Sequence, residues 1–225
     1  MLTREDALKV LDLVKIDVRG FLGRYVFERG ASVFEGLVAV MLTQNTTDKA
    51  AFRVYEALKE RLGEITPRKI LSLNIGELEE LLRPIGAQRQ RALRIVELSR
   101  VVEERFGGSL EFIRNMDVGE ARKLLLSLPG VGPKTADVVL LNLGKPTFPV
   151  DTHIFRISRR LGIVGGYGEV SGFWMSILKP DEYLKMHLAL IAFGRSICRA
   201  KNPKCWLCPL RNSCNYYKAE GVKQT

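Results

Sequence analysis

The sequence predicts an all-α fold, and three observations support this prediction. Apolar residues recur at intervals of three and four, as in Ala7, Leu11 and Val14, which is the spacing of one helix face. Residues that typically begin helices stand before several apolar stretches. Period-two alternation and the Asn-Gly and Asp-Gly pairs of hairpins are missing. From usual helix and loop lengths we expect about ten helices.

Four helix starts can be placed where a polar capping residue stands before an apolar stretch. At three of them a glutamate follows three residues later, which is the pattern of a capping box. At the fourth, a proline takes the first helical position. The predicted N-caps are Ser32, Thr66, Asn74 and Asp117.

Two further stretches, residues 81–96 and 125–140, each follow the pattern helix, short glycine turn, helix. They fit a duplicated helix-turn-helix unit or two ordinary helical hairpins. No long Ser-, Pro- or Gly-rich linker separates the parts of the chain. Any domain boundary is therefore short.

The composition bounds the class of protein. The chain has 225 residues, 46% apolar and 27% charged, which suits one large globular unit or two modest domains and excludes disorder. A membrane helix needs roughly 18 or more apolar residues in a row, and no run here is longer than Leu37–Leu42. The N-terminal MLTREDALKV lacks the apolar core of a signal peptide. We expect an intracellular protein without membrane contact.

The formal net charge is +10, and it is unevenly distributed. Residues 195–225 include seven basic residues and one acidic residue, and all four cysteines lie in the same stretch. Clustered Lys and Arg favour a polyanionic partner because they displace counterions from phosphates. A solubilising surface without a partner is the alternative.

The turn at residues 128–136 contains Gly130 and Gly132, followed by Pro133 and Lys134. Glycine permits positive φ and close backbone approach, and proline suits the first position of the next helix. Free N–H groups at such a helix start form a phosphate site; a plain interhelical turn is the alternative. A nucleotide-binding P-loop is excluded, because it needs a preceding strand and glycine directly before the lysine.

Two charged residues are candidates for chemistry. Lys134 lies in the first turn of its predicted helix, where the positive end of the helix dipole tends to lower its pKa. A neutral amine is what a Schiff-base nucleophile requires; a lysine that contacts phosphate or solvent is the alternative. Asp151 is placed like an N-cap, and a carboxylate there can also stabilise a developing cation. We expect His153 and His187 to be structural.

The four cysteines, Cys198, Cys205, Cys208 and Cys214, have the spacing C-x6-C-x2-C-x5-C. Disulfides need an oxidising compartment, which nothing at the N-terminus indicates. Four clustered thiolates therefore predict a metal site, with either Zn²⁺ or an iron–sulfur cluster. We expect the metal to be structural.

Together these segments resemble the endonuclease III group of helix-hairpin-helix DNA glycosylases. The resemblance rests on LPGVGPKTADVV with Lys134, on PVDTHIFRISRRLG with Asp151 and on the cysteine spacing, and MLTQNTTDKAA extends it over nearly the whole chain. It implies a [4Fe–4S] cluster on the four cysteines rather than zinc. It also implies two helical domains, 26–146 with the hairpin, and 1–25 joined to 147–225 with the cluster loop.

The resemblance implies a base-excision-repair DNA glycosylase and AP lyase that acts as a monomer on damaged double-stranded DNA in the cytoplasm or nucleoid. Such enzymes flip the damaged base out of the stack to reach it. Lys134 would attack the deoxyribose C1′, displace an oxidised pyrimidine and form an imine, and β-elimination would then break the strand. Asp151 would support the cationic sugar and help to activate Lys134.

By the same resemblance, the hairpin and the basic cysteine loop grip phosphates without reading sequence. The chain departs from relatives in three places. Asn45 stands where a gap-filling Gln is usual, Ala87 where a bulky wedge is common, and Asp137 where Asn is frequent, so we expect Gln88 or Ile85 to help to fill the gap. The expected DNA contacts are Gln44, Asn45, Gln88, Gly130, Val131, Gly132, Thr135, Arg199, Lys201 and Lys204.

Two alternative functions remain at this point. A glycosylase for mismatched uracil or thymine, or for alkylated bases, uses the same fold. A non-catalytic DNA-binding module with a structural metal uses the same grip on DNA without the chemistry.

Overall fold

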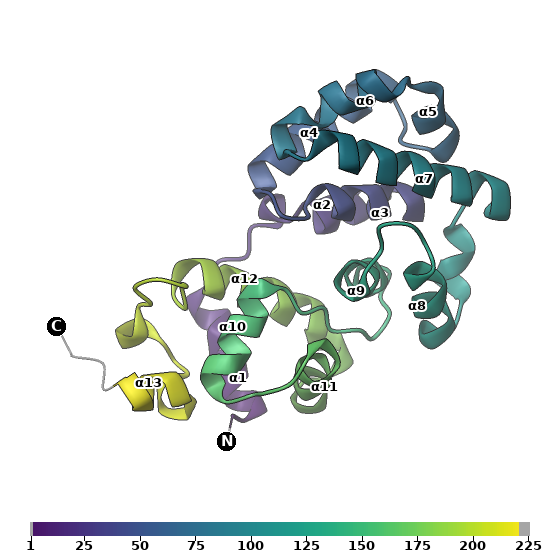
Figure 1. Cartoon of the computed structure of the whole chain (residues 1–225). Helices are drawn as coiled ribbons and strands as arrows, with labels where there is room; N and C mark the ends of the chain where they lie inside the picture. The colour runs from purple at the N-terminus through teal and green to yellow at the C-terminus, as the bar shows by residue number, and fades with distance from the viewer. Residues whose placement is uncertain (1, 221–225) are drawn as a thin grey trace. The chain divides into compact units, whose positions relative to one another are not determined.

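The computed structural model describes residues 2–220, and every regular element within them is helical (Figure 1). The all-α prediction is confirmed. This range contains thirteen α-helices and six short 3-10 helices, more than expected. Helices of six residues are too short to show periodicity: α5 (Pro67–Ser72) was indicated only by its N-cap, and α13 (Asn215–Glu220) had no such signal. No helix in this range is long and apolar enough to cross a membrane. Met1 and residues 221–225, with the predicted basic Lys223, lie outside the described residues.

Contacts divide the chain into two compact units, Val18–Lys145 and the combination of Met1–Asp17 with Pro146–Thr225. We call the first the hairpin unit and the second the cysteine unit. The domain boundaries from the sequence, which assign 26–146 to the hairpin domain, stay a prediction, because contacts alone do not show which part folds independently.

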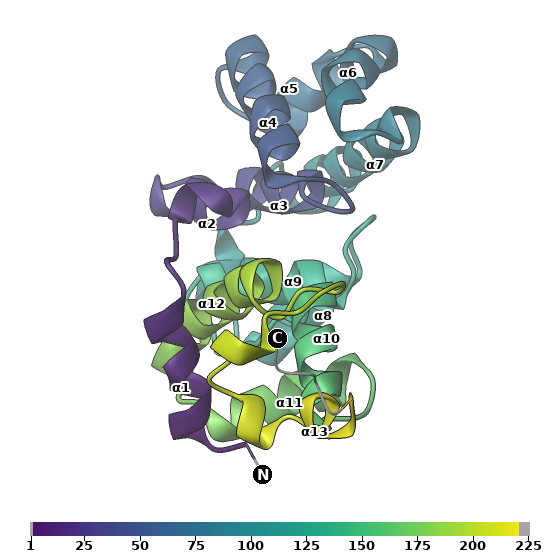
Figure 2. The same cartoon turned by 90° about the vertical axis from the view of Figure 1, so that its left-hand side faces the viewer.

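The hairpin unit is built around α3 (Val33–Leu42), whose ten residues are all buried. Its sequence, VFEGLVAVML, is almost entirely apolar, which is typical of a helix surrounded by others. It contacts α2, α4 and α9, and Figures 1 and 2 show it between α7 and α9. The other helices of this unit are α2 (Leu22–Glu28), α4 (Asp48–Leu62), α5, α6 (Ile75–Leu82), α7 (Gln88–Phe106), α8 (Val118–Leu126) and α9 (Pro133–Asn142).

The four predicted N-caps are confirmed, since each side chain accepts a backbone N–H bond from the first turn of its helix, at α3, α5, α6 and α8. Ser32 Oγ, for example, accepts from Glu35 N at 3.1 Å. The Glu35 carboxylate has other partners than the cap: it accepts from the Tyr55 hydroxyl at 2.6 Å and lies 3.0 Å from Lys59 Nζ. The Glu35 carboxylate therefore binds Tyr55 and Lys59, and α3 is capped by Ser32 alone.

The cysteine unit has its own core. Phe148 and Trp174 stack there with ring centroids 5.9 Å apart, and neither is exposed. The Trp174 indole N–H donates to Ser158 Oγ at 2.9 Å, which satisfies its one polar atom. The N-terminal helix joins this core, because α1 contacts α12 and Arg4 pairs with Glu182. The helices of this unit are α1 (Arg4–Leu13), α10 (Thr152–Leu161), α11 (Tyr167–Ile177), α12 (Tyr183–Ser196) and α13 (Asn215–Glu220).

Candidate active site and cysteine cavity

The hairpin turn joins α8 to α9 and exposes its two glycines. Gly130 has φ +76°, and a Cβ at this position would lie 2.8 Å from Met41 Cε. The left-handed backbone favours glycine, and a Cβ here would also have to displace the end of the Met41 side chain. Val131 is only 7% exposed, and its N–H donates to Leu128 O at 3.2 Å. The turn is therefore anchored by the core while its glycine backbone faces solvent.

The start of α9 has no side-chain cap. Its N-cap is Gly132 and its first residue is Pro133, and both are exposed. A Cβ on Gly132 would meet nothing within 4 Å, so the space beside this helix end is open. N–H groups at such an end, together with the positive end of the helix dipole, suit an anion such as a phosphate. Lys134 lies half-exposed in the same turn, where the sequence predicted it.

Gln44 lies against the hairpin. Its Nε2 donates to Thr135 Oγ1 at 3.1 Å and to Gly130 O at 3.4 Å. Thr135 is only 3% exposed and its hydroxyl accepts from Gln44, so its expected contact with DNA stays a prediction. Asn45, the next residue after Gln44, is exposed and has φ +50°. The structure thus brings two distant predicted segments together within the hairpin unit.

The turn before α7 was expected to supply a gap-filling residue. Gly86 and Ala87 are exposed at this turn, and Ala87 has φ +48°. Ile85 is 5% exposed and belongs to the core. Gln88, the first residue of α7, is half-buried at the surface. Of the two expected gap-filling residues, the structure therefore leaves Gln88 accessible and buries Ile85.

Asp151 is the N-cap of α10, and its Oδ1 accepts a hydrogen bond from Ile154 N at 2.8 Å. Oδ2 makes no hydrogen bond to any other described residue, and the side chain is half-exposed. The cap fixes the carboxylate while one oxygen stays available. Lys134 belongs to the hairpin unit and Asp151 to the cysteine unit. Their joint action stays a prediction.

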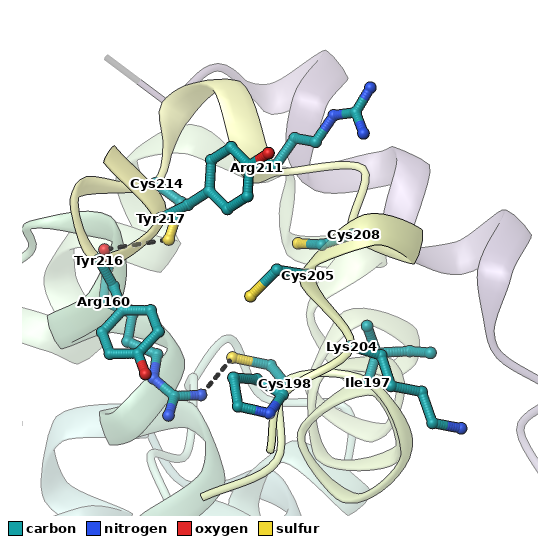
Figure 3. Close-up of a pocket in the computed structure, with 11 residues that line it drawn as sticks. Arg160, Ile197, Cys198, Lys204, Cys205, Cys208, Arg211, Cys214, Tyr216 and Tyr217 are labelled. Carbon is teal, nitrogen blue, oxygen red and sulfur yellow. Dashed lines mark hydrogen bonds between the residues drawn. The ribbon is translucent and has the colours of Figure 1, made fainter. Parts of the chain in front are cut away.

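All four cysteines line one cavity, and Figure 3 shows their sulfur atoms around it. The loop that carries them has little regular structure beyond two 3-10 turns, Cys205–Leu207 and Arg211–Ser213. Within the first turn, Cys208 N donates to Cys205 O at 3.1 Å. These turns set the direction of the thiols in the absence of a long helix.

The donors of this cavity suit an iron–sulfur cluster. Burial, with the three neighbouring thiols, raises the pKa of Cys208 to about 12. A cationic metal centre is the group that stabilises four adjacent thiolates. Within the described residues no three His, Cys, Asp or Glu side chains already stand close enough to hold one metal ion. The loop supplies four soft ligands around a shared cavity, which is the donor set of an iron–sulfur cluster.

Sequence reasoning missed two arginines that hold the cysteine loop, Arg156 and Arg160. Arg160 Nη1 donates to Cys198 Sγ at 3.3 Å (Figure 3). The same nitrogen donates to Arg199 O at 2.8 Å. Arg156 Nε donates to Cys198 O at 3.0 Å. The two residues are four apart on α10 and so share a helix face. That spacing, in a segment already singled out for Asp151, was the signal available.

The three basic residues expected to contact phosphate differ in accessibility. Arg199 is exposed, but its guanidinium folds back to donate to Asn202 O at 2.8 Å. Lys204 is half-buried and lines the cysteine cavity. Lys201 is exposed. Lys201 is therefore the most accessible of the three cations.

Comparison with known proteins decides what these features belong to. A family model described as HhH-GPD superfamily base excision DNA repair protein matches residues 38–172. A second, described as the iron-sulfur binding domain of endonuclease III, matches residues 198–214. Endonuclease III of Sulfolobus acidocaldarius is 34% identical over 214 residues, which cover 93% of this chain and 94% of that protein. The chain belongs to the endonuclease III family.

Solved structures agree with this assignment. A non-covalent endonuclease III–DNA complex matches with a TM-score of 0.77 at 32% identity, over 99% of this chain and 100% of that one. A thermostable thymine-DNA glycosylase matches with a TM-score of 0.75 at 25% identity, over 96% and 95%. Endonuclease III enzymes are DNA glycosylases with AP lyase activity. The predicted fold and enzyme class are confirmed, and the cysteine segment is an iron–sulfur domain.

Proposed function

We propose that this member of the endonuclease III family removes oxidised pyrimidines from duplex DNA and cleaves the strand through a Schiff base on Lys134. The observation that supports the proposal is the exposed glycine hairpin, in which Lys134 lies in the first turn of a helix that begins without a side-chain cap. A phosphate bound at this helix end holds the sugar of a flipped nucleotide near the lysine.

The proposed reaction is a nucleophilic displacement followed by elimination. Lys134 Nζ bonds to C1′ of the damaged nucleotide, and the C1′–N bond to the base breaks. The base leaves with the electron pair and takes up a proton. The amine nitrogen loses a proton and forms a C1′=N imine as the C1′–O4′ bond breaks, and O4′ takes up a proton, which opens the sugar ring. Loss of a C2′ proton then expels the 3′ phosphate, and water hydrolyses the imine to release the lysine.

Asp151 has two proposed tasks in this reaction. Its free oxygen stabilises the positive charge that develops on the sugar as the base leaves. The same oxygen accepts a proton from the Lys134 ammonium group, so that the amine is neutral when it attacks. The hydrogen bond from Ile154 N to Oδ1 fixes the direction of the other oxygen. The reaction requires both units to act on one nucleotide.

For DNA binding we propose a grip on the phosphates with little sequence information. The backbone of Gly130–Gly132 binds at the hairpin, and the accessible Lys201 binds from the cysteine loop. Asn45 and Gln88 fill the gap that the flipped nucleotide leaves. One copy of the chain suffices for these contacts. We propose that it works as a monomer in the cytoplasm or nucleoid, where the DNA is.

We propose that the iron–sulfur cluster is a [4Fe–4S] cluster held by Cys198, Cys205, Cys208 and Cys214. Four thiolates form the complete ligand set of such a cluster. When bound, the cluster cross-links the cysteine loop. Arg160 supports it by donating to Cys198 Sγ. The positions of Lys201 and Lys204 then depend on a loop of fixed shape.

Borohydride trapping tests the lysine directly, because reduction of the imine leaves a covalent protein–DNA adduct. We expect an adduct from the wild type on a duplex with thymine glycol and none from Lys134→Ala. Lys123→Ala, which removes an exposed lysine of α8, serves as the control and should retain the adduct. No adduct from the wild type, or an undiminished one from Lys134→Ala, would overturn the proposal.

The substrate class is tested by comparing base release from three kinds of duplex. We expect faster release of thymine glycol than of mismatched uracil or thymine, or of 3-methyladenine. Faster release of uracil or thymine from a mismatch would show that this protein is a mismatch glycosylase that uses the same lysine chemistry. Binding without release or cleavage on every duplex would point to a DNA-binding module.

A further inference from the structure

Arg91, in the first turns of α7, joins two surface loops of the hairpin unit through its guanidinium. Its Nε donates to Gly86 O at 2.9 Å, in the turn before α7. On the other side, Nη1 donates to Met41 O at 3.3 Å, at the C-terminal end of α3, and Nη2 donates to Gln44 O in the loop that follows. Every acceptor is a backbone carbonyl. The three bonds therefore fix the two backbones relative to each other, whatever side chains the loops carry.

Both loops contain a residue other than glycine in the left-handed region. Asn45 has φ +50° and Ala87 has φ +48°, and within residues 2–220 only Asn202 shares this property. Such a backbone is unfavourable for a residue with a Cβ and persists where the surroundings hold it. Asn45 directly follows Gln44, and Ala87 directly follows Gly86. Arg91 thus binds the carbonyl just before each unfavourable residue.

Arg91 lies in an environment where its guanidinium bonds to backbone carbonyls and not to a carboxylate. The side chain is half-buried, and burial together with the neighbouring Arg94 lowers its pKa. No carboxylate of the described residues pairs with it, although several other arginines of the unit have such partners, among them Arg61 and Arg68. Placing a charge there is unfavourable unless its donors are satisfied. The loop carbonyls are what satisfy them.

We propose that Arg91 is a positioning residue that holds Asn45 and the Ala87–Gln88 turn in one fixed arrangement before DNA binds. In this arrangement both loops can enter the duplex together when the nucleotide flips. The inference rests on the proposed function, because it assigns Arg91 to the flipping step. Arg91 itself contacts neither the base nor the sugar, and it acts through the loops.

The test uses two substrates that differ in whether a gap must be filled. The first is a thymine glycol duplex, on which base release is measured under single-turnover conditions with saturating enzyme. The second is a single-stranded oligonucleotide with a preformed AP site, on which borohydride trapping is measured. The single strand has no opposing base and needs no gap-filling loop, but it still needs Lys134.

We expect Arg91→Ala to slow base release from the duplex roughly tenfold to a hundredfold, because displacing the loops by about 1 Å costs rate on this scale. Borohydride trapping on the single strand should stay close to the wild-type rate. Arg91→Lys keeps the charge but lacks the planar fork, so we expect it to restore the duplex rate only in part. Arg100→Ala, which removes an exposed arginine from the same helix, is the matched control and should change neither rate.

Several results would overturn the inference. Equal losses on both substrates would show a general defect of folding or of the lysine, and a thermal midpoint close to the wild-type value would then point to the lysine. No loss on the duplex would show that the three bonds are dispensable. Full recovery by lysine would show that charge matters and position does not. A wild type inactive on both substrates would instead remove the proposed function, and this inference with it.

Discussion

Arg122 and Asp137 form a bidentate ion pair across the hairpin, with Nε to Oδ1 at 2.7 Å and Nη2 to Oδ2 at 3.2 Å. Arg122 lies on α8 and Asp137 on α9, so the pair ties together the two helices that flank the turn. The Asp137 side chain is 4% exposed and that of Arg122 36%. The pair gives a structural role to an aspartate whose consequence could not be inferred from the sequence.

We expect Asp137→Asn to lower the free energy of unfolding by about 1–3 kcal/mol. The substitution keeps the shape of the side chain and removes the charge that Arg122 binds, and the exposure of Arg122 to water moderates the loss. Urea unfolding measures the change. Glu120→Gln removes an exposed carboxylate that pairs with Lys123 on the same helix and should cost less than about 0.5 kcal/mol. Similar costs for the two variants would contradict this account.

The two hairpin glycines should separate stability from DNA binding. Gly130→Ala places a Cβ at positive φ and against Met41, so we expect it to destabilise the protein by more than about 1 kcal/mol. Gly132 has φ −96° and open space around it, so Gly132→Ala should fold normally. Its methyl group stands where a phosphate would approach, and duplex affinity should fall. Thermal unfolding and a DNA-binding titration on both variants check these expectations. A Gly130→Ala protein as stable as the wild type would refute the expected loss of stability.

Much of the fold was predictable because its signals are local. Ser32 and Asp117 cap helices through bonds to residues two or three positions away, and such bonds follow from sequence spacing. The glycine hairpin and the cysteine spacing are local in the same sense. Both parts of the candidate site can therefore be predicted from the sequence.

What could not be predicted depends on residues far apart in the chain. Gln44 and Thr135 are separated by 91 positions, and no pattern around either one predicts that they bond. The same holds for Arg91, whose acceptors include carbonyls at Met41 and Gln44. Backbone carbonyls leave no trace in the sequence, because every residue has one. The burial of Ile85 likewise follows from packing of the whole unit.

Tyr55 should make stability depend on alkaline pH. It is buried, and burial with the hydrogen bond to Glu35 raises its pKa. In the unfolded chain a tyrosine ionises near pH 10, roughly. The folded state therefore keeps its proton to higher pH, and the stability that results is complete below about pH 10 and declines as pH rises above it.

Tyr55→Phe isolates this contribution. At pH 7 we expect the variant to be less stable by about 1–2 kcal/mol, because the Glu35 carboxylate loses a hydrogen bond. Above pH 10 the difference should narrow, since only the wild type gains an ionised tyrosine in its unfolded state. Urea unfolding from pH 7 to pH 11, roughly, measures the difference. A difference that stays constant across this range would show that Tyr55 titrates alike in both states.

Lys201 should contribute to DNA affinity through charge alone. It is exposed, whereas the guanidinium of Arg199 is bonded to Asn202 O. Log affinity falls as log salt concentration rises, and loss of one phosphate contact makes this slope shallower by roughly one. We therefore expect Lys201→Ala to weaken binding to damaged and undamaged duplexes by the same factor and to reduce this slope for both.

The control for Lys201 is an exposed lysine that already pairs with a carboxylate of this protein. Lys9 is exposed and lies 2.9 Å from the Asp6 carboxylate, so Lys9→Ala should leave the salt slope unchanged. At a saturating concentration of the Lys201→Ala protein, the rate of borohydride trapping should match that of the wild type, because the phosphate contact serves binding and not the reaction at C1′. A larger loss on damaged than on undamaged DNA would contradict this assignment. Lys201 would then take part in recognising the lesion, since a uniform phosphate contact cannot distinguish the two duplexes.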